Sequence, residues 1–303
     1  MAYITGTADD HHDLWDVLIN FLTTNAALVA AGQNWAIEDQ IIQATTREVY
    51  LKGPGLAGED AIHVNMRYFE DLGANRYTWA VRGAGGYLSS ATFSNQPVAS
   101  GEVYIPLSND TMKYWIVGNG RRFIVVHNIG IRYFASYQGF ILPHFLPNEY
   151  TYPLFVSGNH TLASTTVANV ENANFWQNAT AAINKLLFYT GEWLEGNSGH
   201  NPSTSAYRFA SWPWSYHKAS TSAEGWAGGN INNEWSVVPN MLYAGYAGAG
   251  VLGELQGVYM IPGSGVNYDL QPEDTVSIGG VDYLALPDVY RITNSDFAAI
   301  KLE

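Results

Sequence analysis

The stretch YWIVGNGRRFIVVHNIG, residues 114–130, sets two apolar runs on either side of a Gly-Asn-Gly. A dinucleotide-binding loop would need a third glycine where Phe123 stands, and a helix directly after it to present its N-terminus to the pyrophosphate. Instead a second β-type run follows, and Asn119-Gly120 is a preferred pair in tight turns because both residues tolerate positive φ. The stretch therefore predicts a β-hairpin over residues 114–128 that turns at 118–120, and no phosphate loop.

A second hairpin is predicted near the C-terminus. In TVSIGGVDYLAL, residues 275–286, the pair Gly279-Gly280 separates two short alternating apolar runs, which is the pattern of a two-residue hairpin. The final stretch, DFAAIKLE, is typical of a closing strand.

Short strands are also predicted upstream of the first hairpin, between residues 47 and 93. Ile62, Val64, Met66 and Tyr68 alternate with polar residues, which indicates a strand covered on one face. Turns rich in glycine separate these strands. We therefore predict a mainly β fold, with an antiparallel β-sandwich or barrel-like body.

The stretch DLWDVLINFLTTNAALVAAGQNW, residues 13–35, predicts an amphipathic helix capped by Asp13 and ended by Gly32. Its apolar stripe needs a covering surface, which is either the body of the same chain or another subunit. We expect an intersubunit contact there, through five candidate interface residues: Leu14, Val17, Leu18, Phe21 and Leu22.

Residues 158–240 change in character and are polar, rich in Ser, Thr, Asn and Gly, and dotted with aromatics. We interpret them as a loop-rich insertion or surface subdomain with one short helix around residues 179–187. The predicted organisation is a helix and connecting strand over 1–50, a β body over 51–157, the insertion over 158–240, and a hairpin region over 241–303 that completes the body. Trp212, Trp214 and Tyr216 are candidates for stacking on sugar faces, although packing is the favoured interpretation.

Composition narrows the possible partners. The 303 residues carry 14 Lys+Arg against 27 Asp+Glu, a formal charge of −13, so we expect no nucleic-acid partner. The absence of cysteine excludes disulfides, thiolate zinc sites and cysteine nucleophiles. No signal peptide and no bilayer-spanning apolar segment is evident, so we expect a soluble chain without membrane insertion.

No catalytic or metal-binding set is expected from the motifs. In DDHHD, residues 9–13, adjacent histidines should point in different directions, and acids at a helix start serve the helix dipole, so capping is favoured over a metal. The acid pairs 59–60, 70–71 and 273–274 are typical of solvated turns, and no Gly-x-Ser-x-Gly elbow occurs. We therefore expect no catalytic residues, no metal and no cofactor.

Several segments, in this order, resemble a family of virion structural proteins of tailed bacteriophages: FLTTNAALVAAGQNW, LKGPGLAGEDAIHVNMRYFEDLGANRYTWAVRGAGGY, YWIVGNGRRFIVV, YQGFILPHFLPNEYTYPLFVSGN and EDTVSIGGVDYLALPDVYR. The resemblance covers residues 14–157 and 251–303, and reaches the insertion chiefly at Trp212-Pro213.

The resemblance implies a non-enzymatic virion subunit, in the tail or baseplate first and the neck or head surface second. It would be assembled in the host bacterial cytoplasm with other virion proteins and copies of itself. One alternative is a host-attachment protein that binds cell-surface polysaccharide through the aromatic insertion. The other is an envelope-glycan hydrolase, which would need two convergent carboxylates in a cleft.

Overall fold

The computed structural model describes residues 1–43, 46–146, 149–161, 174–176, 183–196, 208–212, 237–244, 249–262, 264–265, 268–287 and 296–302. The fold is mainly β, and the described strands pair antiparallel except for the parallel pair of β13 and β14. A five-stranded antiparallel sheet runs in chain order through β2 (Ala36–Ile42), β3 (Arg47–Gly53), β4 (Ile62–Asp71), β5 (Arg76–Ala84) and β6 (Val103–Leu107), with the short 3-10 helix η1 (Leu72–Ala74) between β4 and β5.

A longer sheet of 14 strands makes up most of the remaining structure. Its first half runs in the order β1 (Ala2–Ala8), β7 (Met112–Gly118), β8 (Arg122–Ile129), β9 (Arg132–Phe140), β11 (Leu154–Ser157), β12 (Asn184–Leu187) and β13 (Trp193–Gly196). Its second half continues through β14 (Arg208–Trp212), β15 (Val238–Ala244), β16 (Gly250–Pro262), β21 (Asp296–Lys301), β20 (Val281–Pro287) and β19 (Thr275–Ile278). The short β10 (Leu142–Pro143) pairs with β16, and β17 (Ser264–Gly265) pairs with β18 (Tyr268–Asp269).

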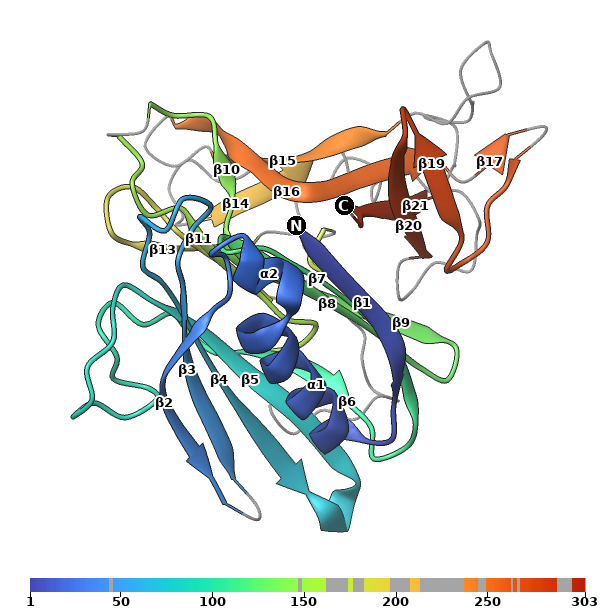
Figure 1. The fold of residues 1–303 in the computed structure, drawn as a ribbon. Helices are drawn as coiled ribbons and strands as arrows, with labels where there is room; N and C mark the ends of the chain where they lie inside the picture. Colours follow the sequence, from blue (N-terminus) through green and yellow to red (C-terminus); the bar gives the residue numbers. More distant parts are fainter. Residues whose placement is uncertain are drawn as a thin grey trace.

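The sheets are stacked as a sandwich-like body, and the described strands do not close into a barrel (Figure 1). One core lies between the five-stranded sheet and one face of β7 and β8, where Ile116 and Val125 point. A second core lies on the opposite face, where Val117 and Ile124 meet C-terminal residues such as Ile300. The hairpin of residues 114–128 is thus the middle layer, which explains why both of its runs are apolar throughout.

The predicted hairpin is confirmed, but its turn lies at 119–122 rather than 118–120, and it forms for a different local reason. β7 and β8 pair with Gly118 opposite Phe123, and neither Asn119 nor Gly120 has a positive φ. Asn119 stabilises the turn through its side chain, because Oδ1 accepts the backbone N–H groups of Arg121 and Arg122 at 2.8 and 3.0 Å. A glycine fits at 120 because a Cβ there would lie 1.9 Å from a neighbouring carbonyl oxygen.

The C-terminal hairpin and closing strand are confirmed as predicted. Ile278 pairs with Val281, and the intervening Gly279 and Gly280 have φ of 60° and 80°, values that an L side chain rarely adopts. Strand β21 pairs with both β16 and β20, so it joins the hairpin to the rest of the sheet.

The alternation along β4 is present, but the strand is covered on both faces. Val64 and Met66 lie in the first core as expected. On the other face His63 and Asn65 are also buried. The prediction of a half-covered strand was therefore incomplete, because polar residue type does not report burial when ion pairs and loops cover the outer face.

The N-terminal helix is confirmed with corrected ends. Helix α1 (His11–Thr24) is capped by Asp10 rather than Asp13, and Asn25 ends it and caps the short α2 (Ala26–Ala30). Figure 1 shows α1 lying between the five-stranded sheet and β1.

The apolar stripe of α1 lies in the chain's own core. The side chains of Leu14, Leu18 and Leu22 are fully buried and that of Phe21 is 3% exposed, while Val17 is partly buried against the same core. The chain's own core covers four of these five side chains, so our expectation of an intersubunit contact through the whole stripe is corrected. The helix covers its own sandwich.

The described parts of residues 158–240 belong to the long sheet, and do not form a separate surface unit. Strands β12 to β15 continue it, and Leu186 and Phe209 are fully buried in the second core. The predicted helix over 179–187 is wrong at its C-terminal end, where 184–187 form β12. Among the described residues, no helix has the length and apolar character required to cross a bilayer.

Candidate functional site

Two histidines and a glutamate converge where the start of α1 meets the end of β4. The Nε2 atom of His11 lies 2.9 Å from Glu70 Oε1, and Nε2 of His12 contacts the same oxygen. The exposed fractions of the side chains are 2% for His11, 32% for His12 and 9% for Glu70. The group is therefore buried on one side and open to solvent on the other.

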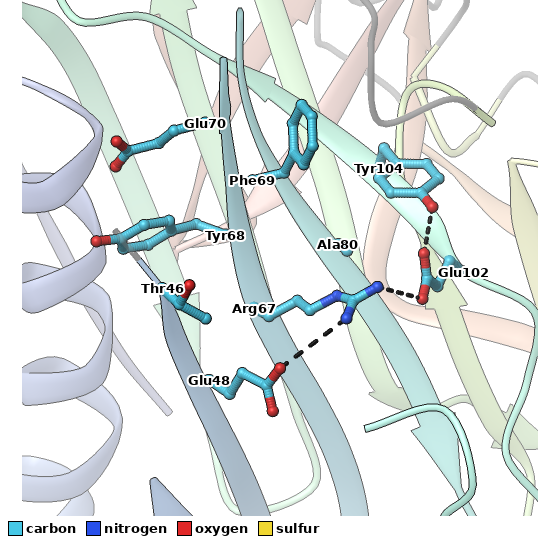
Figure 2. Close-up of a pocket in the computed structure, with 9 residues that line it drawn as sticks. All are labelled: Thr46, Glu48, Arg67, Tyr68, Phe69, Glu70, Ala80, Glu102 and Tyr104. Carbon is cyan, nitrogen blue, oxygen red and sulfur yellow. Dashed lines mark hydrogen bonds and ion pairs between the residues drawn. The ribbon is translucent and has the colours of Figure 1, made fainter. Parts of the chain in front are cut away.

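The helix cap fixes the position of the histidines. Asp10 has an extended backbone, and its Oδ1 accepts the N–H groups of His12 and Asp13 at 2.8 and 2.9 Å. The cap places His11 and His12 in the first turn. Glu70 lies on the face of β4 that points toward α1, as Figure 2 shows together with Tyr68.

The convergence corrects the prediction that the two adjacent histidine side chains point in different directions. Their Cα–Cβ directions do diverge on a helix, but the side chains rotate toward one oxygen and their ring centroids lie only 4.1 Å apart. Tyr68 stacks on His12 at 4.9 Å, and Tyr77 lies 4.5 Å from His11. These aromatic rings restrict the orientation of both imidazoles.

The environment favours neutral His11 and ionised Glu70. Burial lowers the pKa of His11, and hydrogen bonding to Glu70 offsets this only in part. Burial alone would raise the pKa of Glu70, but the hydrogen bonds with His12 and His11 outweigh it, so its pKa lies below the ordinary value. Imidazole nitrogen and carboxylate oxygen are ligand types for a divalent transition metal.

A groove of about 430 Å³ is lined by Tyr68 and Glu70 and also by residues on the other face of the sheet. Figure 2 shows the side chains of Tyr68 and Arg67 pointing in opposite directions from their strand. On the other face, Arg67 lies between two carboxylates, with its guanidinium nitrogens 3.9 Å from Glu48 and 2.9 Å from Glu102. Arg82 also contacts Glu102 at 3.0 Å, and the Tyr104 hydroxyl donates to it.

This network holds its carboxylates in ion pairs. Burial alone would raise the pKa of Glu102, but hydrogen bonds from Tyr104 and Arg82 outweigh it and leave the pKa below its ordinary value. Burial and the neighbouring Glu102 raise the pKa of Tyr104 to about 12. A general acid for glycoside hydrolysis needs a raised pKa, and Glu102 has the opposite shift.

The other predicted residues fall elsewhere. Trp212 ends β14, while Trp214 and Tyr216 lie outside the described residues, so the glycan-stacking hypothesis stays a prediction. Of the acid pairs, Glu70 belongs to the histidine cluster and Asp71 caps η1. Glu273 contacts Lys113 and Tyr133 in a separate region.

Sequence reasoning missed the role of Glu70 because its partners lie 58 and 59 residues earlier in the chain. The signal that the sequence did contain was the pair of adjacent histidines, His11 and His12, beside aspartates at a helix start. No protein-family model matches the chain, and a search of curated proteins finds no match.

Proposed function

We propose that this chain is a non-enzymatic structural subunit of a tailed-bacteriophage virion, in the tail or baseplate, and that it acts through protein–protein contacts in a symmetric assembly. The segments that resemble the virion family build all the layers of the body. Residues 14–157 supply α1, the five-stranded sheet and the middle hairpin, and residues 251–303 supply C-terminal strands. The resemblance therefore falls mainly on the layers built outside residues 158–240, whose described strands continue the long sheet.

The observation that carries the proposal is the open edge of the five-stranded sheet. Strand β2 is outermost, so one side of its backbone has no strand partner among the described residues. It also exposes apolar side chains: Ile37 is 36%, Ile41 39% and Ile42 65% exposed. Unprotected edge strands pair readily with other chains, which makes this edge, rather than the α1 stripe, the surface best suited to a neighbouring subunit.

The carboxylate network opposes the hydrolase alternative. Glu48 and Glu102 are the convergent pair in the described groove, and both contact the guanidinium of Arg67. A retaining or inverting glycosidase needs one carboxyl group protonated and one available to attack sugar or water. Carboxylates held by arginine suit a structural role.

Two measurements test the proposal. Antibodies raised against the folded chain should label purified phage particles at the tail or baseplate in electron micrographs, and absence of the chain from purified particles would refute the virion role. Labelling confined to an outward-projecting tip, with binding of host polysaccharide by the isolated chain, would favour the attachment alternative.

The edge is tested by the double variant Ile41→Lys/Ile42→Lys. It should fold normally, because both side chains are exposed, and should fail to enter particles. Leu88→Lys, which changes an equally apolar exposed residue in a loop, is the matched control and should incorporate like the wild type. Normal incorporation of the double variant would exclude β2 as the contact surface.

A further inference from the structure

We propose that His11, His12 and Glu70 form a binding site for one divalent transition metal ion of the Zn²⁺ class. This site goes beyond the proposed assembly function and is independent of it. It would join the start of α1 to the end of β4, two segments that are distant in the chain.

The donor atoms are close enough to share one ion. One ligand atom from each of the three residues lies within 4.8 Å of the others, and the His11–Glu70 distance is 2.9 Å. In a tetrahedral zinc site, bonds of about 2.0–2.1 Å place the ligand atoms about 3.3 Å apart. Shifts of less than about 1 Å in side-chain positions would therefore accommodate the ion, without movement of α1 or β4.

The donor types select the class of metal. Imidazole nitrogen suits Zn²⁺, Co²⁺, Ni²⁺ and Cu²⁺, whereas Ca²⁺ and Mg²⁺ require mostly oxygen ligands. His11 is buried, and the tyrosine rings of Tyr68 and Tyr77 hold both imidazoles against the carboxylate. Asp10 is engaged in the cap, so within the cluster three protein ligands remain, with a water as the fourth.

The site is also accessible. His12 is 32% exposed, and Glu70 is among the residues that line the groove of about 430 Å³. An ion can therefore enter the folded chain. Binding would replace two hydrogen bonds to a single oxygen by three metal–ligand bonds, and would hold the helix start against the sheet.

Untagged protein treated with EDTA and dialysed is titrated with Zn²⁺ by calorimetry and with Co²⁺ by visible absorption. We expect one ion per chain at this site, cobalt d–d bands typical of nitrogen and oxygen ligands, and a Tm that rises by about 5 °C when free Zn²⁺ is about 100-fold above its Kd. His12→Gln and Glu70→Gln should each weaken binding at least about 10-fold.

The control is His144→Gln, which removes an exposed histidine outside the cluster and should bind like the wild type. Circular dichroism confirms that the variants are folded, which is expected because glutamine keeps hydrogen-bonding capacity at both positions. The proposal is overturned if the wild type binds neither Zn²⁺ nor Co²⁺ at about 100 μM, a concentration far above the Kd of structural zinc sites. It is equally overturned if either ion binds with unchanged affinity to both cluster variants, since the ligands would then lie elsewhere.

Discussion

His127, in β8, should make the stability of the fold fall as the pH drops toward 5. Its side chain is fully buried, Nε2 lies 2.8 Å from the carbonyl oxygen of Pro106, and the ring stacks on Phe134. Burial lowers its pKa to about 4, against about 6.5 in an unfolded chain. The folded protein therefore holds His127 neutral over a range in which the unfolded chain binds a proton.

The sign follows from proton linkage. Above about pH 6.5 the residue is neutral in both states and has no effect on stability. As the pH falls from about 6.5 to about 4, the unfolded state gains a proton that the folded state does not, so the free energy of unfolding decreases. The loss is about 2 kcal/mol at pH 5 and approaches about 3.4 kcal/mol below pH 4.

Urea unfolding at about pH 7.5 and about pH 5, in EDTA, measures this loss in the wild type and in His127→Gln. The glutamine can still donate to Pro106 O but does not titrate, so the variant should lose about 2 kcal/mol less than the wild type. Burial also lowers the pKa of His11 and His63. Both residues are present in the wild type and in His127→Gln, so their effect on the pH dependence of stability cancels when the two proteins are compared. His144→Gln is the exposed control. Equal losses in the wild type and His127→Gln would refute the reasoning.

Three further variants test the packing. Leu18→Ala should lower the free energy of unfolding of the isolated chain by about 2–5 kcal/mol, because Leu18 is fully buried in the core. A decrease of less than about 1 kcal/mol in urea unfolding would contradict this placement. Gly120→Ala should lower the free energy of unfolding by more than about 1 kcal/mol, because the added Cβ would lie 1.9 Å from Gly55 O. Gly73→Ala is the tolerant control in the same urea assay, because the atom nearest to its added Cβ is 3.6 Å away. Arg122→Met should leave the free energy of unfolding unchanged or raise it, because Arg122 is fully buried and its Nε and Nη1 have no hydrogen-bond partner among the described residues. A decrease of more than about 3 kcal/mol, measured by thermal unfolding, would show instead that the charge is paired.

The elements that the sequence predicts well are those set by neighbouring residues. The two hairpins follow from glycine-containing turns between apolar runs, and the helix from its 3.6-residue period. In both hairpins the pairing register is local, so a short window of sequence contains the information needed. The helix start was misplaced by a few residues because Asp9, Asp10 and Asp13 are all plausible caps, and only the backbone shows that Asp10 accepts the bonds.

The stacking of the layers could not be predicted in the same way. The α1 stripe needs a covering surface, but its periodicity is the same whether that surface is the chain's own sheet or a neighbour. Likewise, the polar residues His63 and Asn65 on β4 look solvent-facing in sequence and are buried in the fold. These features depend on contacts between distant segments, which hydrophobic pattern alone does not encode.

The histidine cluster shows why a correct local argument about a helix cap does not decide whether the same residues form a site. One aspartate of DDHHD, Asp10 rather than the predicted Asp13, caps the helix, and a cap at this position is the reason the sequence gives for favouring capping over a metal. Yet the cap is the feature that makes the cluster possible, because Asp10 starts the helix at His11 and so presents both imidazoles in the first turn. The third group, Glu70, arrives through the pairing of β4 with β5 in a register that no spacing within residues 9–13 could reveal.

Capping and metal binding use different atoms here, since the cap is made by Asp10 Oδ1 and the backbone, while the two Nε2 atoms remain directed at the carboxylate. The two roles are therefore compatible, and evidence for the cap carries no weight against the metal.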